Sequence, residues 1–338
     1  MLKLERLRLR RDLAVALLVA GTPLVGSGCA SGVPEPWQTM LGRDHPLTGR
    51  IWDVSALSFL DAPTLVGHLA RGRFILLGEK HDNPDHHRLQ ARLLRALVAA
   101  GRRPAVGFEM FNTDDQPAIA QHLAATPTDA AGLARAVEWA RRGWPDWALY
   151  QPIAEAALEA GLPIVATNLP GDTMRALRHD GVVTLDPALV ARLGLDRPLA
   201  PDVHAEMAAE IRDSHCGYAS GAVVETMVTV QRARDAQMAE RLAAAADDED
   251  GAVLIAGAGH VRNDRGIPMH LARKAPEAPV VSLAFLEVGR DRSDPAAYAE
   301  RFGRASLPFD YVWFTPRLDD LDPCEKFEKQ LRRLRKKR

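Results

Sequence analysis

The segment RFILLGEKHDNPDHHRLQARLLRALVAAG, residues 73–101, joins a short apolar run to a longer amphipathic one, and this order decides the fold. The run Phe74–Gly78 is apolar throughout, which is typical of a strand buried on both faces of a sheet. From Asp85, a candidate N-cap, to Ala100, leucines recur on one stripe, and Gly101 supplies a helix stop. A buried strand followed by such a helix predicts a β–α unit of a parallel sheet.

Five further apolar runs repeat this pattern along the chain. They are Ala105–Glu109, Pro163–Asn168, Ala252–Gly257, Pro279–Leu286 and Tyr311–Thr315. Helical patterns lie between them, over residues 147–160, 203–214 and 221–246. The sequence therefore predicts one α/β domain, residues 51–318, with a mostly parallel central sheet and helices on both of its faces.

The first residues have the layout of an export signal. A basic stretch precedes the apolar run Leu13–Val25, which is too short to span a membrane, and small residues lead to Cys29. We therefore expect residues 1–28 to be a signal peptide and Cys29 to be lipidated; the alternative is a plain cleaved signal. Arg10 and Arg11 leave the twin-arginine export route open beside the general one.

An exported lipoprotein would be anchored in a membrane and face the periplasm. Residues 29–50 are rich in Pro and Gly and predict a tether from the lipid to the domain. Ser31, two positions after the lipidated cysteine, favours the outer membrane over the inner one.

Charge is concentrated at the two ends of the chain. Residues 1–28 sum to +3 and residues 326–338 to +7, which leaves −11 for residues 29–325 of a chain whose net charge is −1. An acidic body argues against a nucleic-acid partner. Residues 319–338 form a basic tail, either solvated or a short amphipathic helix on anionic lipid.

Two cysteines remain after Cys29. Cys216 and Cys324 are too few for a disulfide framework, and the sequence leaves open one bridge between them or two free thiols.

Polar residues gather where the expected strands end. Glu79 and His81 follow the first run, Glu109 ends the second, and His260 follows the run Ala252–Gly257. In open α/β sheets ligands bind outside these strand ends. Carboxylates and imidazoles ligate Zn²⁺ or Mn²⁺, and they also act as general acids and bases. Each of the four also has a structural interpretation, as a cap or an ion pair.

Other constellations are weaker, and several catalytic motifs are missing. His215, Cys216 and Tyr218 lie between two helices, and residues of these types can ligate haem iron. Arg232, Arg234 and Arg262 are candidates for facing an anionic group. The chain has no GxSxG, HExxH, Walker A or GxGxxG motif, which disfavours serine hydrolases, P-loop NTPases and dinucleotide enzymes.

Seven motifs between residues 45 and 268 carry a resemblance to a known family. They are HPLTGRIWD (45–53), LLGEKHDNPDHHRLQ (76–90), RRPAVGFEMF (102–111), GWPDWALYQPI (143–153), LPIVATN (162–168), RARDAQMAE (232–240) and GAGHVRNDRGIP (257–268). With these motifs the chain resembles the ChaN family of haem-binding lipoproteins, within the Tiki and erythromycin-esterase-like superfamily. The last motif departs from the family pattern at Ala258, where asparagine is expected.

The resemblance implies a haem-binding, non-enzymatic lipoprotein with a role in haem or iron uptake. It further implies haem held between two subunits, which would make the protein a homodimer. The candidates for the axial ligand of the iron are Tyr150, Tyr218, His215 and His87, and the sequence does not choose among them. Arg262 is a candidate partner for the haem propionates.

The superfamily also supplies an alternative function at the strand ends. It contains proteins that look like metal-dependent hydrolases, and their shared motif matches Glu79, His81, Glu109 and His260. Under this hypothesis the four residues hold Zn²⁺ or Mn²⁺, a metal-bound water is the nucleophile, and one glutamate is the general base.

Overall fold

The computed structural model describes residues 36–326 and residue 328. The expected signal peptide, Cys29 and residues 329–338 of the basic tail lie outside the described residues. Within the described part, no helix combines the length and the apolar character that crossing a membrane requires.

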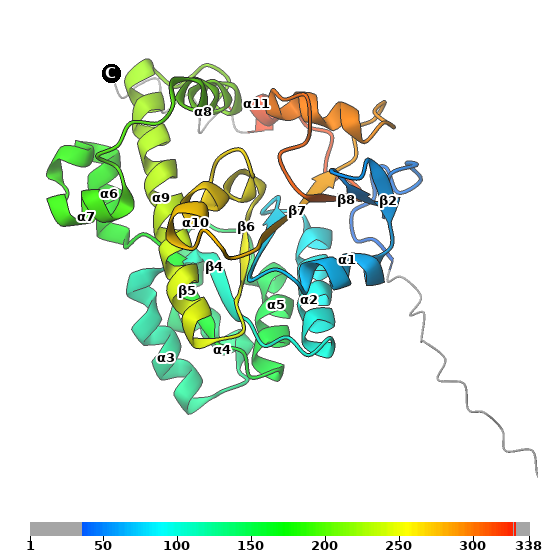
Figure 1. Ribbon diagram of the computed structural model, residues 1–338, viewed down its shortest axis with the longest axis horizontal. Helices are drawn as coiled ribbons and strands as arrows, with labels where there is room; N and C mark the ends of the chain where they lie inside the picture. Colours follow the sequence, from blue (N-terminus) through cyan, green and yellow to red (C-terminus); the bar gives the residue numbers. More distant parts are fainter. Residues whose placement is uncertain (1–35, 327, 329–338) are drawn as a thin grey trace, which may run out of the picture. The chain divides into compact units, whose positions relative to one another are not determined.

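Eight strands form one sheet in the order β2-β1-β8-β7-β3-β6-β4-β5 (Figure 1). The strands are β1 (Ile51–Asp53), β2 (Ser58–Leu60), β3 (Phe74–Glu79), β4 (Ala105–Asn112), β5 (Ile164–Asn168), β6 (Ala252–Gly257), β7 (Val280–Glu287) and β8 (Tyr311–Thr315). All contacts from β8 across to β5 are parallel, whereas β1 pairs antiparallel with both β8 and β2. The mostly parallel α/β sheet expected from the sequence is therefore confirmed. The three-residue strands β1 and β2 are too short for a periodicity to reveal.

Helices cover both faces of the sheet, as expected. The α-helices are α1 (Ala62–Leu69), α2 (Pro84–Ala99), α3 (Gln116–Ala125), α4 (Ala130–Ala136), α5 (Trp147–Glu159), α6 (Gly171–Asp180), α7 (Pro187–Leu193), α8 (Pro201–Ser214), α9 (Gly221–Asp248), α10 (Ile267–Lys274) and α11 (Pro323–Lys326). The 3₁₀ helices are η1 (Thr113–Asp115), η2 (Trp139–Arg141), η3 (Val182–Thr184), η4 (Ala258–Val261) and η5 (Ala296–Phe302).

The core is divided by the sheet into two layers, because successive side chains of a strand point to opposite faces. In β3, Ile75 and Leu77 pack with helices α1 to α5, whereas Phe74 and Leu76 pack with α9 and α10. A near-continuous apolar strand is thus typical of a sheet that has helices on both faces.

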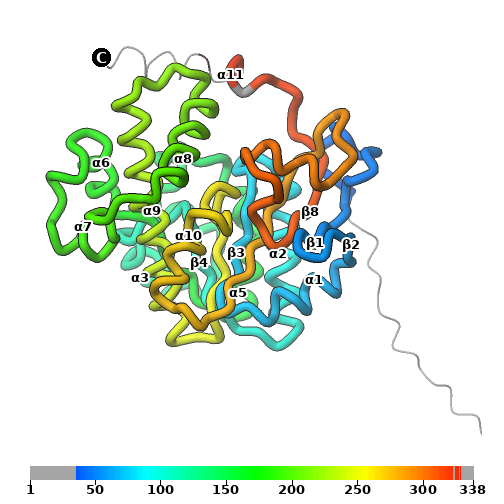
Figure 2. Tube along the Cα trace, turned by 45° about the horizontal axis from the view of Figure 1, so that its top comes forward, coloured from blue at the N-terminus to red at the C-terminus, as the bar shows by residue number. Residues whose placement is uncertain are grey.

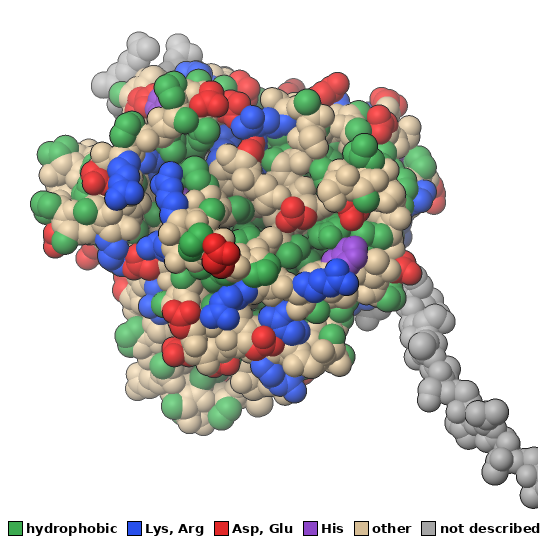
Figure 3. All heavy atoms as spheres, in the orientation of Figure 1, with side chains coloured by type: hydrophobic (Ala, Val, Ile, Leu, Met, Phe, Trp, Pro, Cys, Tyr) green, Lys and Arg blue, Asp and Glu red, His purple; other side chains and the backbone are tan. Residues whose placement is uncertain are grey.

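A group of helices lies beyond the sheet. Helices α6, α7 and α8 pack on the N-terminal half of α9 through two small apolar clusters of their own (Figures 1 and 2). On the face drawn in Figure 3, acidic and basic side chains are interspersed. A loop, residues 215–220, joins α8 to the start of α9.

The helix after β3 begins differently from the sequence prediction. Asn83, not Asp85, is the N-cap: its side chain accepts a hydrogen bond from the Asp85 backbone N–H, and Pro84 occupies the first helical position. The buried carboxylate of Asp85 instead accepts hydrogen bonds from the backbone N–H groups of Gln38 and Thr39, each at 2.9 Å. The domain therefore begins at Trp37, and residues 37–50 are part of it rather than of a tether.

Cys216 and Cys324 form a disulfide, with their Cα atoms 5.8 Å apart. The bridge resolves the alternative that the sequence leaves open. It ties the loop between α8 and α9 to α11, two segments separated by 108 residues of chain.

Replacing both cysteines by serine is expected to lower the free energy of unfolding by about 2–4 kcal/mol, because the bridge restricts the unfolded chain. Urea unfolding of the native chain and of the variant measures the difference. A reducing agent should lower the free energy of unfolding of the native chain by the same amount. It should not change the free energy of unfolding of the variant. Two titratable thiols in unreduced, denatured residues 30–338, which lack Cys29, would contradict the bridge.

Candidate functional site

The four strand-end residues come together at one edge of the sheet. Glu79 ends β3, Glu109 lies in β4, and His260 lies in η4 directly after β6, the strand between them. These three side chains are buried, whereas the His81 side chain is about one-third exposed, at 34%. Adjacent parallel strands place their carboxyl ends side by side, which is why residues so far apart in sequence meet.

The distances define a connected set of charges. His81 Nδ1 lies 2.9 Å from Glu79 Oε1, and His81 Nε2 lies 3.9 Å from Glu109 Oε1. His260 Nε2 lies 3.2 Å from the same Glu109 oxygen. Gly257 donates its backbone N–H to Glu109 Oε2 at 2.6 Å, and a Cβ at this glycine would lie 3.0 Å from His81 Nε2. A side chain at position 257 would therefore crowd His81.

Helix α9 contributes two further members of this set. Asp235 Oδ1 lies 2.5 Å from His260 Nδ1, and the Arg234 guanidinium donates to Glu109 Oε1 at 2.5 Å. Arg234 also donates to Asn168 Oδ1 at the end of β5. Arg234 was expected as a candidate, but Asp235 was missed; its signal was its place beside Arg234 in the RARDAQMAE motif. We call Glu79, His81, Glu109, Asp235, His260 and Arg234 the acid–base cluster.

Two of the expected haem ligands lie inside this network rather than on a surface. His87 and Tyr150 are fully buried. His87 Nδ1 lies 2.8 Å from Glu79 Oε2, and the Tyr150 hydroxyl donates to Glu79 Oε1 at 3.0 Å. Burial and the Glu79 charge both raise the pKa of Tyr150, so the phenol keeps its proton.

The cluster holds its charges by mutual pairing. Burial opposes ionisation of Glu79, but His87 and His81 lower its pKa to about 2. Burial likewise disfavours the charged form of His260, but Glu109 and Asp235 raise its pKa to about 9. Burial also opposes ionisation of Glu109, whose pKa His260 and Arg234 nevertheless hold well below its usual range. At neutral pH His260 is thus an imidazolium between two carboxylates.

This pairing predicts a loss of stability at alkaline pH. The pKa of His260 is raised from 6.5 to about 9 by folding, so its contribution is complete below pH 6.5 and is lost as the pH rises through 9. Urea unfolding at pH 6 and at pH 9.5 measures this loss. Between these pH values we expect the free energy of unfolding of the native chain to fall by about 3 kcal/mol more than that of His260→Gln. If the free energy of unfolding depends on pH in the same way in both proteins, His260 is not a cation in the folded protein.

The cluster does not form a metal site. Among the described residues, no group of three or more His, Cys, Asp or Glu side chains is arranged to hold a metal ion. The donors face one another instead, since Glu109 is engaged by Arg234 and Gly257, and His260 Nδ1 by Asp235. The Zn²⁺ or Mn²⁺ hypothesis for Glu79, His81, Glu109 and His260 therefore has no support from this geometry.

The other two expected haem ligands share one accessible loop. His215 and Tyr218 lie between α8 and α9, both partly exposed, on either side of the disulfide-bonded Cys216. His215 Nδ1 lies 2.7 Å from the backbone carbonyl of Ile211, so this nitrogen donates. Within the described chain, neither His215 Nε2 nor the Tyr218 hydroxyl has a hydrogen-bond partner.

The expected propionate partner, Arg262, is already engaged. Its guanidinium is buried and pairs with Glu210 at 2.8 Å and with Asp264 at 2.7 Å. Arg265 pairs with the same glutamate, and Arg304 pairs with Asp264. These ion pairs fasten α8 to the loop after η4, so the role of Arg262 in this structure is to position the helix that leads to His215.

A small cavity of about 40 Å³ lies between α8 and α9. It is lined by Ile211, whose carbonyl holds His215, and by Asp235, which pairs with His260. The fold and the site together define an α/β protein with a buried acid–base cluster at the carboxyl edge of its sheet and a separate, exposed loop of candidate metal ligands.

The chain belongs to the ChaN family of the Tiki superfamily, described as haem-binding uptake, whose model matches residues 65–271. Among solved structures it is similar to ChaN of Campylobacter jejuni, described with cofacial haem binding. That similarity has 20% identity and a TM-score of 0.61, and it covers 78% of this chain and 95% of the other. An erythromycin esterase in its open conformation matches at 17% identity over 75% of this chain and 78% of its own, with a TM-score of 0.42. No curated protein sequence matches significantly. The family assignment expected from the seven motifs is confirmed.

Proposed function

We propose that this protein binds haem through the loop between α8 and α9, as an exported lipoprotein in haem or iron uptake. Family membership supports haem as the ligand. The single observation that carries the choice of site is accessibility. Of the four expected ligands, His87 and Tyr150 are buried against Glu79, whereas His215 and Tyr218 are partly exposed.

The residues of this loop fit the coordination of haem iron. Haem, when bound, supplies an iron that takes an axial nitrogen or oxygen ligand from the protein. Because His215 donates through Nδ1 to a backbone carbonyl, its Nε2 is left with the lone pair, as in most metal-ligating histidines. The Tyr218 hydroxyl is the second candidate. The exposed Arg212, in the last turn of α8, is placed to meet a propionate.

A haemin titration of residues 30–338 tests this function. We expect a red-shifted Soret band that saturates at a fixed haem-to-protein ratio. Sedimentation of the same samples would show whether haem brings two copies together, as the family resemblance implies. Weak absorbance that rises without saturation would overturn haem binding as the function.

Lipidation at Cys29 and a position facing the periplasm belong to the same proposal. The signal-like layout of residues 1–28 supports it, together with membership of a family described as haem-binding uptake. Labelling of cells with an alkyne analogue of palmitate should mark the full chain, and Cys29→Ser should lose the label. Equal labelling of both proteins would contradict acylation at this residue.

A hydrolase that works without a metal is the second candidate, favoured by the place of His260 between Asp235 and Glu109. With its raised pKa, His260 would donate a proton at neutral pH rather than accept one. Turnover of p-nitrophenyl esters that His260→Asn abolishes, with haem binding unchanged, would support this activity. If the native chain does not hydrolyse these esters, the hydrolase hypothesis is wrong.

A further inference from the structure

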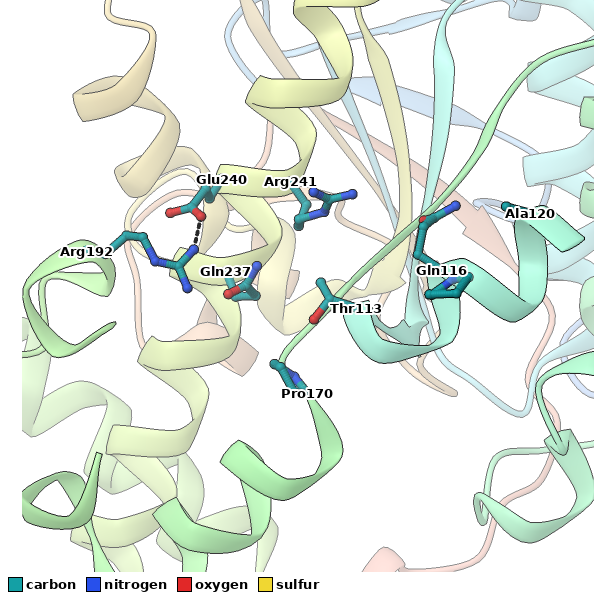
Figure 4. Close-up of a pocket in the computed structure, with 9 residues that line it drawn as sticks. Thr113, Gln116, Ala120, Pro170, Arg192, Gln237, Glu240 and Arg241 are labelled. Carbon is teal, nitrogen blue, oxygen red and sulfur yellow. Dashed lines mark hydrogen bonds and ion pairs between the residues drawn. The ribbon is translucent and has the colours of Figure 1, made fainter. Parts of the chain in front are cut away.

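A second cavity lies beside α9, next to the C-terminal half of that helix. It is open on one side, has a volume of about 540 Å³, and is formed by the start of α3, the end of β5, α7 and α9 (Figure 4). Its lining residues are Thr113, Gln116, Pro117, Ala120, Pro170, Arg192, Gln237, Glu240 and Arg241. None of them belongs to the acid–base cluster or to the loop proposed to bind haem.

The cavity carries excess positive charge. Glu240 is shared by two cations, Arg192 and Lys274. Arg241 pairs with no carboxylate in the described part of the chain; its Nε donates only to the carbonyl of Ala166, at 3.4 Å. A guanidinium in a concave site without a carboxylate partner favours an anion.

Gln237 is an independent indication of a ligand. The residue is only 4% exposed, and its amide, which makes no hydrogen bond within the described residues, is open to the cavity. Figure 4 shows this amide between Arg192 and Thr113, on the wall of the cavity. An amide that lines a concave site and has no protein partner is available to hydrogen-bond a polar ligand.

The neighbouring Gln116 is already engaged. Its side chain accepts from the Ala166 N–H at 2.7 Å and donates to the Ile164 carbonyl at 3.2 Å, which closes the outer edge of β5. Gln116 is therefore a wall of the cavity. Arg241 and Gln237 are the groups left to face a ligand.

We propose that this cavity binds a small organic carboxylate. A carboxylate matches the single unpaired guanidinium of Arg241 through two parallel hydrogen bonds, and Gln237 can donate to it or accept from the rest of the ligand. Pro117, Ala120 and Pro170 supply an apolar wall for the body of the ligand, and the volume is that of a small-molecule site. A phosphate dianion fits less well, because Glu240 lies in the same wall. This site is independent of haem binding.

Titration of the haem-free chain with benzoate, followed by protein NMR, tests the proposal. We expect saturable binding to one site, with shifts confined to the segments that line the cavity, which are the start of α3, the residues after β5, α7 and α9. Arg241→Gln and Gln237→Leu should each weaken benzoate binding at least about tenfold. Arg241→Lys, which keeps the charge, should retain more affinity than Arg241→Gln, and Arg175→Gln, on exposed α6, is the matched control that should bind as the native chain does.

The other outcomes overturn the proposal. They are no saturable benzoate binding by the native chain, binding that Arg241→Gln and Gln237→Leu leave unchanged, or saturable binding of inorganic phosphate that excludes benzoate. Circular dichroism of each variant identifies any that fails to fold. Because Gln237→Leu removes no hydrogen bond within the described residues and keeps a similar side-chain size, it keeps the test valid if the Arg241 variants are unstable.

Discussion

The double variant His215→Ala/Tyr218→Phe is expected to lose haem affinity by more than about 100-fold, with the red-shifted Soret band absent at haem concentrations that saturate the native chain. Both groups lie in the loop between α8 and α9, where His215 Nε2 and the Tyr218 hydroxyl have no partner among the described residues. The single variants identify the ligand, because only the loss of the ligating side chain changes the position of the Soret band.

Tyr150→Phe is the matched control for this experiment. It removes a hydroxyl that is buried and donates to Glu79, so it should disturb the cluster and leave the Soret band in place. If Tyr150→Phe loses the band while the double variant keeps it, the haem ligand is Tyr150, next to the cluster, and the proposed site is wrong. That result would still agree with haem binding as the function.

The second large effect concerns stability. Arg234→Ala is expected to lower the free energy of unfolding by about 3–5 kcal/mol, because it leaves the buried carboxylate of Glu109 without its guanidinium partner. Partial compensation by His260, 3.2 Å away, favours the lower end of this range. Guanidinium-chloride unfolding, monitored by circular dichroism, measures the difference.

Two further variants separate the charge effect from lost packing. Arg175→Ala removes an exposed arginine that pairs with an exposed aspartate, and it should cost no more than about 1 kcal/mol. Adding Glu109→Gln to Arg234→Ala should recover part of the lost stability, since the unpaired charge is then gone. A cost for Arg234→Ala as small as that of the control would show that Glu109 is not ionised in the folded protein.

The strands could be predicted closely because each is a short apolar run with a polar end. Ala252–Gly257 and Tyr311–Thr315 match the structure, and β3 differs from its predicted extent by one residue, Glu79. The first residue of α2 could not be predicted in this way. Asn83 and Asp85 are both residue types that cap helices. Asn83 is the N-cap because Pro84 occupies the first helical position and because the Asp85 carboxylate accepts hydrogen bonds from the distant backbone of Gln38 and Thr39.

By itself the sequence determined the parallel sheet, the family and the convergence of Glu79, Glu109 and His260, because these follow from local hydrophobic patterns and from the common edge of parallel strands. What each polar group faces depends on contacts between distant segments, which the structure shows. The tertiary structure showed that Asp235 pairs with His260, that Arg262 is held in ion pairs, and that Cys216 and Cys324 are joined. It also separated the buried Tyr150 and His87 from the accessible His215 and Tyr218. Such pairings depend on distances between segments far apart in the chain, and a local sequence pattern carries no information about those distances.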